Sequence, residues 1–204
     1  MKAKILPGIP PQKKGAYHDT EKTKILVNSE MCDIKYKILK ENFLCVNHWK
    51  DHGGRGSAEF KLYDYNGTYK TTQPIEGDFM RIDIPGPGDL KAKGYDWVKI
   101  MKLTNEFCLD DEIECLTMIT QPSEKPGDRS GHIAHFYSKE STASFRIAKG
   151  KDFLRVGIYG RNELCNVSDS GFFGRIRNFF IASGGFVQLT KLQWAELAEG
   201  LINN

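Results

Sequence analysis

Through the middle of the chain, apolar and polar residues alternate with the two-residue period of β-strands. In one clear case Met80 and Ile82 alternate with Arg81 and Asp83. Strands are predicted in this way at residues 24–28, 58–63, 78–84, 95–103, 112–121, 133–137, 144–148 and 152–159. The pattern therefore predicts six to eight strands.

Two tight turns join neighbouring strands. Asn66-Gly67 is the residue pair that a hairpin turn with positive φ requires, and it follows the strand at 58–63. Residues 149–151, Lys-Gly-Lys, connect the strands at 144–148 and 152–159 into a second hairpin. These short connections favour an antiparallel sheet.

Between residues 33 and 52 the period changes to that of a helix, and Gly53-Gly54 ends the run. The apolar stripe of this helix consists of Ile38, Leu39, Phe43, Val46 and Trp49. A strand at 33–39 is the competing interpretation, because Ile34, Tyr36 and Ile38 also alternate.

The end of the chain, residues 171–202, has the pattern of a helical hairpin. A first helix around Ile176 is ended by Gly184-Gly185, and a second begins at Thr190, which forms a capping box with Gln193. The second helix presents Trp194, Leu197 and Leu201 on one stripe, and this stripe is expected to pack on the sheet.

Together these elements predict an α+β fold, an antiparallel sheet covered by an early helix and a C-terminal helical hairpin. Residues 1–22, which hold three of the eight prolines, are expected to form an extended arm, and residues 23–204 a single domain. A strongly curved sheet that grips the last helix and a β-sandwich with a helical cap both satisfy this order.

Composition narrows the class of protein. Hydrophobic residues make up 40% and charged residues 27% of the 204 positions, a balance typical of a folded globular chain. The net charge of +3 is too small to indicate a nucleic-acid or membrane-surface partner. Five cysteines without a C-x-x-C pair predict reduced, mostly buried thiols and, with no apolar targeting segment, a cytoplasmic protein.

A metal site is one candidate for chemistry. Cys45, His48 and His52 lie three and seven residues apart, a spacing that brings the three side chains to one side of a continuous helix. One thiolate and two imidazoles suit zinc, and three protein ligands leave an open position for catalysis. Chance spacing among five cysteines and five histidines is the simpler interpretation.

Two further groups of residues are candidates for binding. Arg161, Arg175 and Arg177 could clamp a carboxylate or phosphate, although pairing with Glu163 and Asp169, which fixes this corner, is the favoured interpretation. Aromatic side chains form the second group, on the sheet face opposite Phe60 and Leu62, where they form either a binding surface or a second core layer. They are Tyr63, Tyr65, Tyr69, Tyr95 and Trp97.

Three functions remain open. The leading hypothesis is a non-catalytic module that binds a protein partner or itself through the aromatic face and the N-terminal arm, with no cofactor. The second is a small-molecule carrier with a cavity between a curved sheet and the last helix, lined by Trp194 and by Met80 or Met118. The third is a hydrolase that uses zinc at Cys45, His48 and His52.

Overall fold

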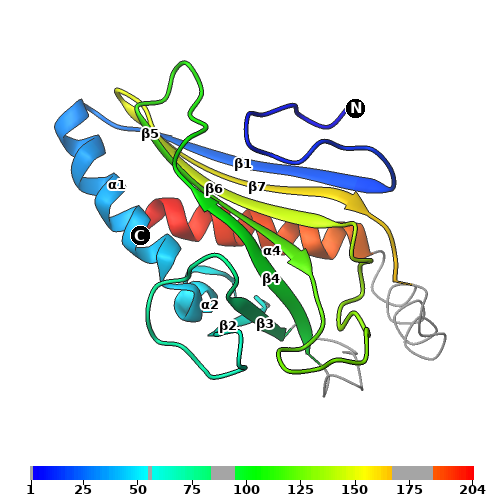
Figure 1. Cartoon of the computed structure of the whole chain (residues 1–204). Coiled ribbons are helices and arrows are strands. Elements are labelled where there is room, and N and C mark those ends of the chain that lie inside the picture. Colours follow the sequence, from blue (N-terminus) through cyan, green and yellow to red (C-terminus); the bar gives the residue numbers. More distant parts are fainter. Residues whose placement is uncertain (1, 55–56, 84–94, 167–185) are drawn as a thin grey trace.

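The computed structural model describes residues 2–54, 57–83, 95–166 and 186–204, and for residues 186–192 the backbone only. Its centre is one seven-stranded antiparallel sheet, and helix α4 runs along one face of it (Figure 1). The α+β prediction is confirmed. The elements are β1 (Ala16–Ile25), α1 (Ser29–Leu44), η1 (Val46–His48), α2 (Trp49–His52), β2 (Glu59–Tyr63), β3 (Phe79–Asp83), β4 (Asp96–Thr104), β5 (Glu114–Pro122), β6 (Thr142–Lys149), β7 (Phe153–Glu163) and α4 (Phe186–Asn203).

The order of the strands in the sheet is β1-β7-β6-β5-β4-β3-β2. Every neighbouring pair is antiparallel, and the predicted hairpin of β6 and β7 is present, with Lys149 opposite Leu154. A turn also occurs at Asn66-Gly67, where Tyr63 and Tyr69 form a β-bridge. Of the predicted positive-φ pair only Gly67 has a positive φ, of +80°, and the turn does not lead directly into β3. The described residues form a single sheet, so the sandwich alternative is not observed.

Strand β1 is the largest difference from the sequence prediction. Residues 16–25 were expected to lie mostly in an extended arm, but they pair with β7 as an edge strand. The segment carries almost no apolar residues, so it shows no hydrophobic alternation; a charged edge strand is a known protection against unwanted pairing. The arm itself is therefore shorter, residues 2–15, and Arg161 donates to its Lys4 carbonyl oxygen.

The early helix is confirmed, with different limits and a break. Asn28 caps α1 by accepting a hydrogen bond from the Met31 amide at 2.9 Å, so the helix begins before Asp33. It ends at Leu44, because Cys45 leaves the helical conformation, and η1 and α2 follow as separate short pieces. The strand alternative at 33–39 is wrong, and Ile38 is only half-buried.

Helix α4 begins at Phe186, four residues before the predicted capping box at Thr190. Its stripe packs on the sheet as predicted: Leu197 and Leu201 are buried in the main core, and Trp194 packs against that core. The first helix of the predicted hairpin lies outside the described residues. No described helix is both long enough and apolar enough to span a membrane.

The sheet face that packs against α1 and α4 is called the core face here, and the opposite face the outer face. Residues 105–113 cover part of the outer face, where Glu112 accepts a hydrogen bond from Arg146 at 2.7 Å and another from Arg155 at 2.9 Å. A disulfide joins Cys108 to Cys115, so the prediction of fully reduced cysteines is wrong for this pair. Cys32 is a buried thiol, whereas Cys45 and Cys165 are exposed.

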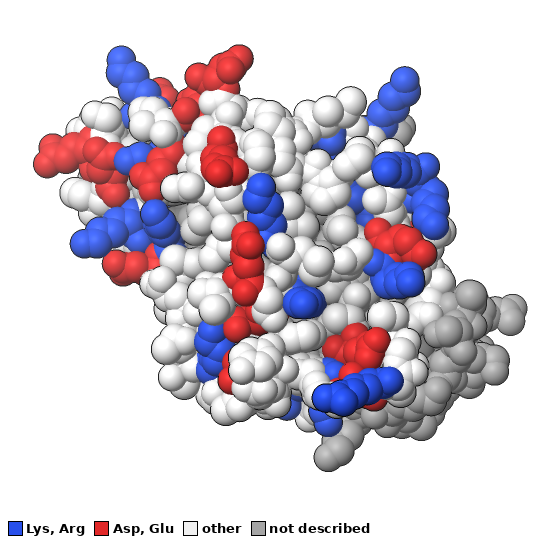
Figure 2. Space-filling view, in the orientation of Figure 1, with Lys and Arg blue, Asp and Glu red and all other residues white. Residues whose placement is uncertain are grey.

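Charged side chains of both signs are intermixed on the face of the molecule shown in Figure 2. The predicted strand at 133–137 is absent. This segment forms a loop beside β4, in which the Trp97 amide donates to the Ala134 carbonyl oxygen, and Tyr137 makes an isolated bridge to Cys165. The loop brings His135 and Tyr137 to the core face near the end of the sheet.

Candidate functional site

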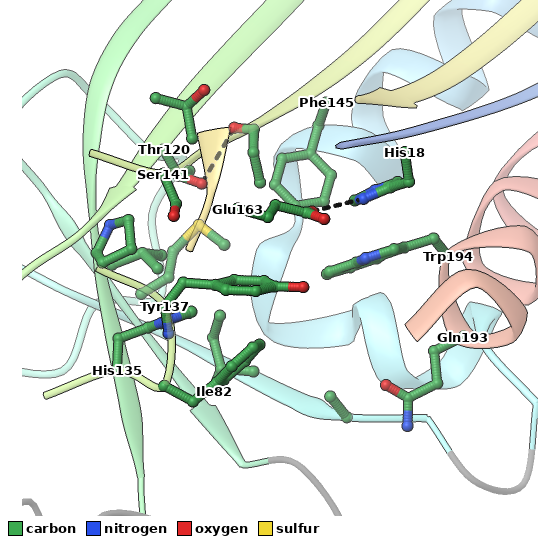
Figure 3. A pocket seen from close by; sticks show the side chains of 17 residues that line it. His18, Ile82, Thr120, His135, Tyr137, Ser141, Phe145, Glu163, Gln193 and Trp194 are labelled. Carbon is green, nitrogen blue, oxygen red and sulfur yellow. Dashed lines mark hydrogen bonds and ion pairs between the residues drawn. The ribbon is translucent and has the colours of Figure 1, made fainter. Parts of the chain in front are cut away.

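A cavity of about 60 Å³ lies between the core face of the sheet and α4. Much of its wall is apolar, with Met80, Ile82 and Val98 from the sheet and Trp194 from α4. His18 from β1, Glu163 from β7 and Tyr137 from the loop before β6 converge in one part of the cavity (Figure 3). An apolar cavity with a few converging polar groups is the usual form of a small-molecule site.

This part of the cavity is built around a buried pair, His18 and Glu163. The Nδ1 atom of His18 lies 2.7 Å from Oε1 of Glu163, and the two side chains are only 6% and 7% exposed. A carboxylate accepts hydrogen bonds, so Nδ1 donates to Glu163, and the neutral form of the ring has its lone pair on Nε2. Nε2 has no hydrogen-bond partner among the described residues, although it is buried.

Two irregularities in the backbone bring this pair together. A bulge in β1 shifts the register between Ala16 and His18, and bulges commonly change the direction of a side chain. Asn162 on β7 has a φ of 55°, which breaks the alternation of the strand. As a result Glu163 lies on the same side of β7 as Gly160, and not beside Arg161.

Gly160 provides the space that the pair needs. A Cβ atom at this position would lie 2.0 Å from Oε1 of Glu163 and 2.3 Å from Nδ1 of His18. Both distances are far below van der Waals contact, so any larger residue would displace the imidazole or the carboxylate. The absence of a side chain at residue 160 is therefore part of the site.

Tyr137 is the third member of the cluster. Burial, together with the charge of Glu163 and a hydrogen bond to it, raises the pKa of the Tyr137 hydroxyl. The hydroxyl therefore stays protonated and donates to Glu163, which holds the carboxylate from a second side. Glu163 is thus fixed between His18 and Tyr137 in a region of low water access.

His135 lies on the same cavity wall but has a different environment. Desolvation lowers the pKa of His135 to about 3, so the ring is neutral at physiological pH. Its Nδ1 accepts a hydrogen bond from the Tyr137 amide at 2.9 Å, while the Asp96 carboxylate, 4.0 Å from Nε2, is at the limit of an ion pair. His135 therefore fixes the loop that positions Tyr137.

Trp194 covers the other side of His18. The two rings are nearly parallel, with 9° between their planes and 6.2 Å between their centroids. Trp194 also contacts Phe145 and Phe60, which attaches the N-terminal half of α4 to the sheet. The indole lines the cavity on the α4 side.

The predicted zinc ligands do not share one helix. Cys45 is the C-cap of α1, His48 ends η1 and His52 ends α2, so the continuous helix that would align them is broken. His48 is 70% exposed and pairs with Asp51. The zinc site stays a prediction, but the continuous helix on which it was based is not present.

Another cluster of three potential metal ligands occurs among the described residues. The ligand atoms of Cys108, Glu112 and Cys115 lie within 4.8 Å of one another. The two sulfurs are bonded to each other, and Glu112 is held by Arg146. In this state the cluster closes a loop and offers no free ligand set.

Arg161 has a structural environment. It is fully buried and donates to the carbonyl oxygens of His18, Gly160 and Lys4, with an ion pair to Asp19 at 2.7 Å. This agrees with the interpretation that Arg161 fixes a corner, but its acidic partner is Asp19 and not Glu163. The other two predicted arginines, Arg175 and Arg177, lie outside the described residues.

Most of the predicted aromatic face forms a small second core. Trp97 is 4% exposed beneath Ala134, and Tyr63 and Tyr95 pack against it. Tyr65 is 75% exposed at the turn, and Tyr69 contacts Tyr63. The alternative of a second core layer is therefore the one that fits the outer face.

Sequence reasoning placed Trp194 and Met80 at a cavity, and both line this one, whereas Met118 is buried in the main core. It missed His18, Tyr137 and Glu163. His18 lies in the segment predicted as an arm, and 145 residues separate it from Glu163. The β1–β7 pairing that joins them has no local signal.

No family model and no curated protein matches this chain. Similar solved structures include norcoclaurine synthase from Thalictrum flavum in complex with dopamine and hydroxybenzaldehyde, at 12% identity and a TM-score of 0.39 over 95% of this chain and 93% of that one. Another is an uncharacterised protein from Bacillus thuringiensis, at 16% identity and a TM-score of 0.35 over 89% of this chain and 99% of that one. A third is Ara h 8.0201, at 10% identity and a TM-score of 0.35 over 93% of this chain and 100% of that one. At such low identities and TM-scores, the similarity assigns neither a family nor a function to this chain.

Proposed function

We propose that this protein binds a small organic molecule in the cavity between the sheet and α4. The observation that carries the proposal is the unpartnered Nε2 of His18, a buried polar atom on the wall of an otherwise apolar cavity. Leaving such an atom without a partner costs roughly 1–3 kcal/mol. A ligand that supplies a hydrogen-bond donor there recovers this energy.

The size of the cavity restricts the ligand. About 60 Å³ is well below the ~150 Å³ cavity that admits benzene. We expect a compact ligand with a short apolar part and one hydroxyl or amide donor. A ring-sized ligand requires Trp194 to move.

The leading hypothesis from the sequence, a module for protein–protein contacts, has less support. Its two surfaces were the aromatic face, which is largely a second core around Trp97, and the N-terminal arm, which is bound to the body through Asn162. The carrier hypothesis needs a cavity lined by Trp194 and Met80, which is the arrangement described above. We therefore place small-molecule binding first.

The test is a thermal-shift screen with short alcohols, amides and ketones, followed by amide NMR of the compounds that stabilise the protein. Binding to the native state raises the unfolding temperature by mass action. We expect alcohols and amides to stabilise more than ketones of equal size, with shift changes around His18, Glu163 and Trp194. The proposal is contradicted if no compound raises the unfolding temperature, or if the chemical shifts change only for surface residues.

His48→Gln is a matched control for His18→Gln. His48 also pairs with a carboxylate through Nδ1, at 3.0 Å from Asp51, but on the surface. Binding should weaken in His18→Gln and remain unchanged in His48→Gln. Equal effects of the two substitutions would remove the cavity from consideration.

A further inference from the structure

We propose that the cavity is a hydrolytic active site in which His18, oriented by Glu163, is the general base for a water molecule that attacks a short-chain acyl ester. This inference rests on the proposed function, because the acyl group must first bind in the cavity. It goes beyond binding by assigning a reaction, a substrate class and a role to each polar group of the cluster.

The geometry of the pair is that of a base with its supporting acid. Glu163 receives the Nδ1 hydrogen of His18 at 2.7 Å, which fixes the tautomer and leaves Nε2 as the proton acceptor. The same carboxylate stabilises the imidazolium that forms when Nε2 takes a proton, as the carboxylate of a catalytic triad does. Burial of both side chains strengthens this interaction, since little water screens it.

The nucleophile in this scheme is water and not the Ser141 hydroxyl. Ser141 is a hydroxyl on the cavity wall, but its Oγ donates to the Asn162 carbonyl oxygen at 2.8 Å and also lies 3.4 Å from the Leu164 amide. It is therefore held away from the role of an activated serine. A cavity of about 60 Å³ exceeds the ~10–15 Å³ that one water molecule needs, which leaves space for a short acyl group beside the water.

The reaction consumes only water. Nε2 of His18 takes a proton from the water as its oxygen forms a bond to the carbonyl carbon of the ester. The tetrahedral intermediate then collapses, the bond between that carbon and the alcohol oxygen breaks, and the leaving alkoxide takes the proton from the imidazolium. The products are a short carboxylic acid and an alcohol, and His18 returns to its neutral state.

Tyr137 is a positioning residue in this scheme. Its hydroxyl bonds to Glu163 and not to the reacting atoms, so it keeps the carboxylate directed at His18. Trp194 closes the α4 side of the cavity and limits the length of the acyl chain. The apolar wall of Met80 and Val98 accommodates the methyl end of the acyl group.

The experiment measures hydrolysis of p-nitrophenyl acetate, butyrate and octanoate by the full chain. We expect kcat/KM to fall steeply with acyl length, because a cavity of about 60 Å³ has little room beyond a short acyl group. His18→Gln should lower kcat/KM for the acetate by about 100-fold, within the range of a lost general base, and Glu163→Gln by about 10-fold or more. Tyr137→Phe should lower kcat with little change in KM.

Surface histidines also hydrolyse activated esters slowly, so the control is His48→Gln, which should change nothing. Circular dichroism and thermal denaturation show that each variant is folded. Activity that survives His18→Gln, or that is independent of acyl length, overturns the inference. Loss of activity in His48→Gln also overturns it and favours a metal site at Cys45, His48 and His52.

The two proposals fail separately. If short alcohols and amides bind at the cavity but no variant-sensitive hydrolysis is found, the hydrolytic inference is wrong and the binding function stands. If neither binding nor hydrolysis depends on His18, both are wrong.

Discussion

The imidazole of His18 lies over Gly160, so close that a Cβ atom on residue 160 would lie 2.3 Å from its Nδ1. The same Cβ would lie 2.0 Å from Oε1 of Glu163. His18 and Gly160 are opposite each other in the pairing of β1 with β7. The His18–Glu163 pair can therefore be disturbed without changing either of its members.

Gly160→Ala should separate the pair and cost about 1–3 kcal/mol of unfolding free energy, since the added methyl group overfills a packed site. Ester hydrolysis should fall nearly as far as in His18→Gln. Urea denaturation measures the stability. A double-mutant cycle is the control: the cost of Gly160→Ala should shrink when both His18 and Glu163 are alanine. A cost independent of that background contradicts the steric explanation.

Trp194→Ala should enlarge the cavity and lower the unfolding free energy by about 3 kcal/mol, at the lower end for tryptophan because the indole is only partly buried. Free indole should then restore part of the lost stability, and the hydrolysis profile should shift towards longer acyl chains. Thermal denaturation with and without indole measures the effect. The neighbouring Gln193→Ala serves as the control and should show no rescue; equal rescue of both variants would mean that indole binds elsewhere.

The sequence predicts those parts of the fold whose hydrophobic pattern and turns lie close together along the chain. The β6–β7 hairpin was predictable because Leu154, Val156 and Ile158 alternate on a core-facing strand next to a short turn. β1 was not, because its core-facing positions include His18 and Thr20, and its partner strand lies more than a hundred residues away. Edge strands with polar residues on both faces carry no periodic signal.

The candidate site shows the same limit. Trp194 was predictable, because a large aromatic residue on a helical stripe must pack on something. Glu163 was not, because its direction depends on the positive φ of Asn162, whose side-chain oxygen accepts long-range hydrogen bonds from the amides of Lys13 and Lys14. The zinc prediction gained no support, because the spacing of Cys45, His48 and His52 brings them together only on a continuous helix, and α1 ends at Leu44.

Arg161→Met should lower the unfolding free energy by about 3 kcal/mol, because it leaves the Asp19 carboxylate without its cation and frees three carbonyl oxygens. Hydrogen exchange should accelerate in β1 and in the arm more than in β5. Adding Asp19→Asn should recover part of the loss. Arg129→Met, at an exposed position, is the control and should stay within about 0.5 kcal/mol of the parent.

The Cys108–Cys115 disulfide predicts a thiol count that can be measured directly. Ellman's reagent in denaturant should find three thiols, those of Cys32, Cys45 and Cys165, and five after reduction. Loss of the bond should cost about 2.5 kcal/mol, the chain-entropy value for a loop of roughly eight residues. A Cys108→Ser/Cys115→Ser variant should match the reduced protein and be insensitive to reductant. Five thiols before reduction would show that the bond does not form.

His135 makes a specific contribution to the pH dependence of stability. Desolvation holds the pKa of this buried ring at about 3, below the value of about 6.5 expected when the chain is unfolded. The neutral ring therefore costs no stability above pH ~6.5, and stability falls as the pH decreases towards 3, because the unfolded chain binds the proton first. At pH ~4.5 the loss should be about 2–3 kcal/mol relative to pH ~7.

His135→Asn removes this titration, while the amide oxygen can still accept the hydrogen bond from the Tyr137 amide. Its unfolding free energy should decrease less steeply than that of the parent between pH ~7 and ~4.5. His48→Asn, which removes an exposed histidine, should follow the parent curve. Parallel curves for the parent and His135→Asn would show that His135 takes up its proton in the folded state, with the Asp96 carboxylate as its partner.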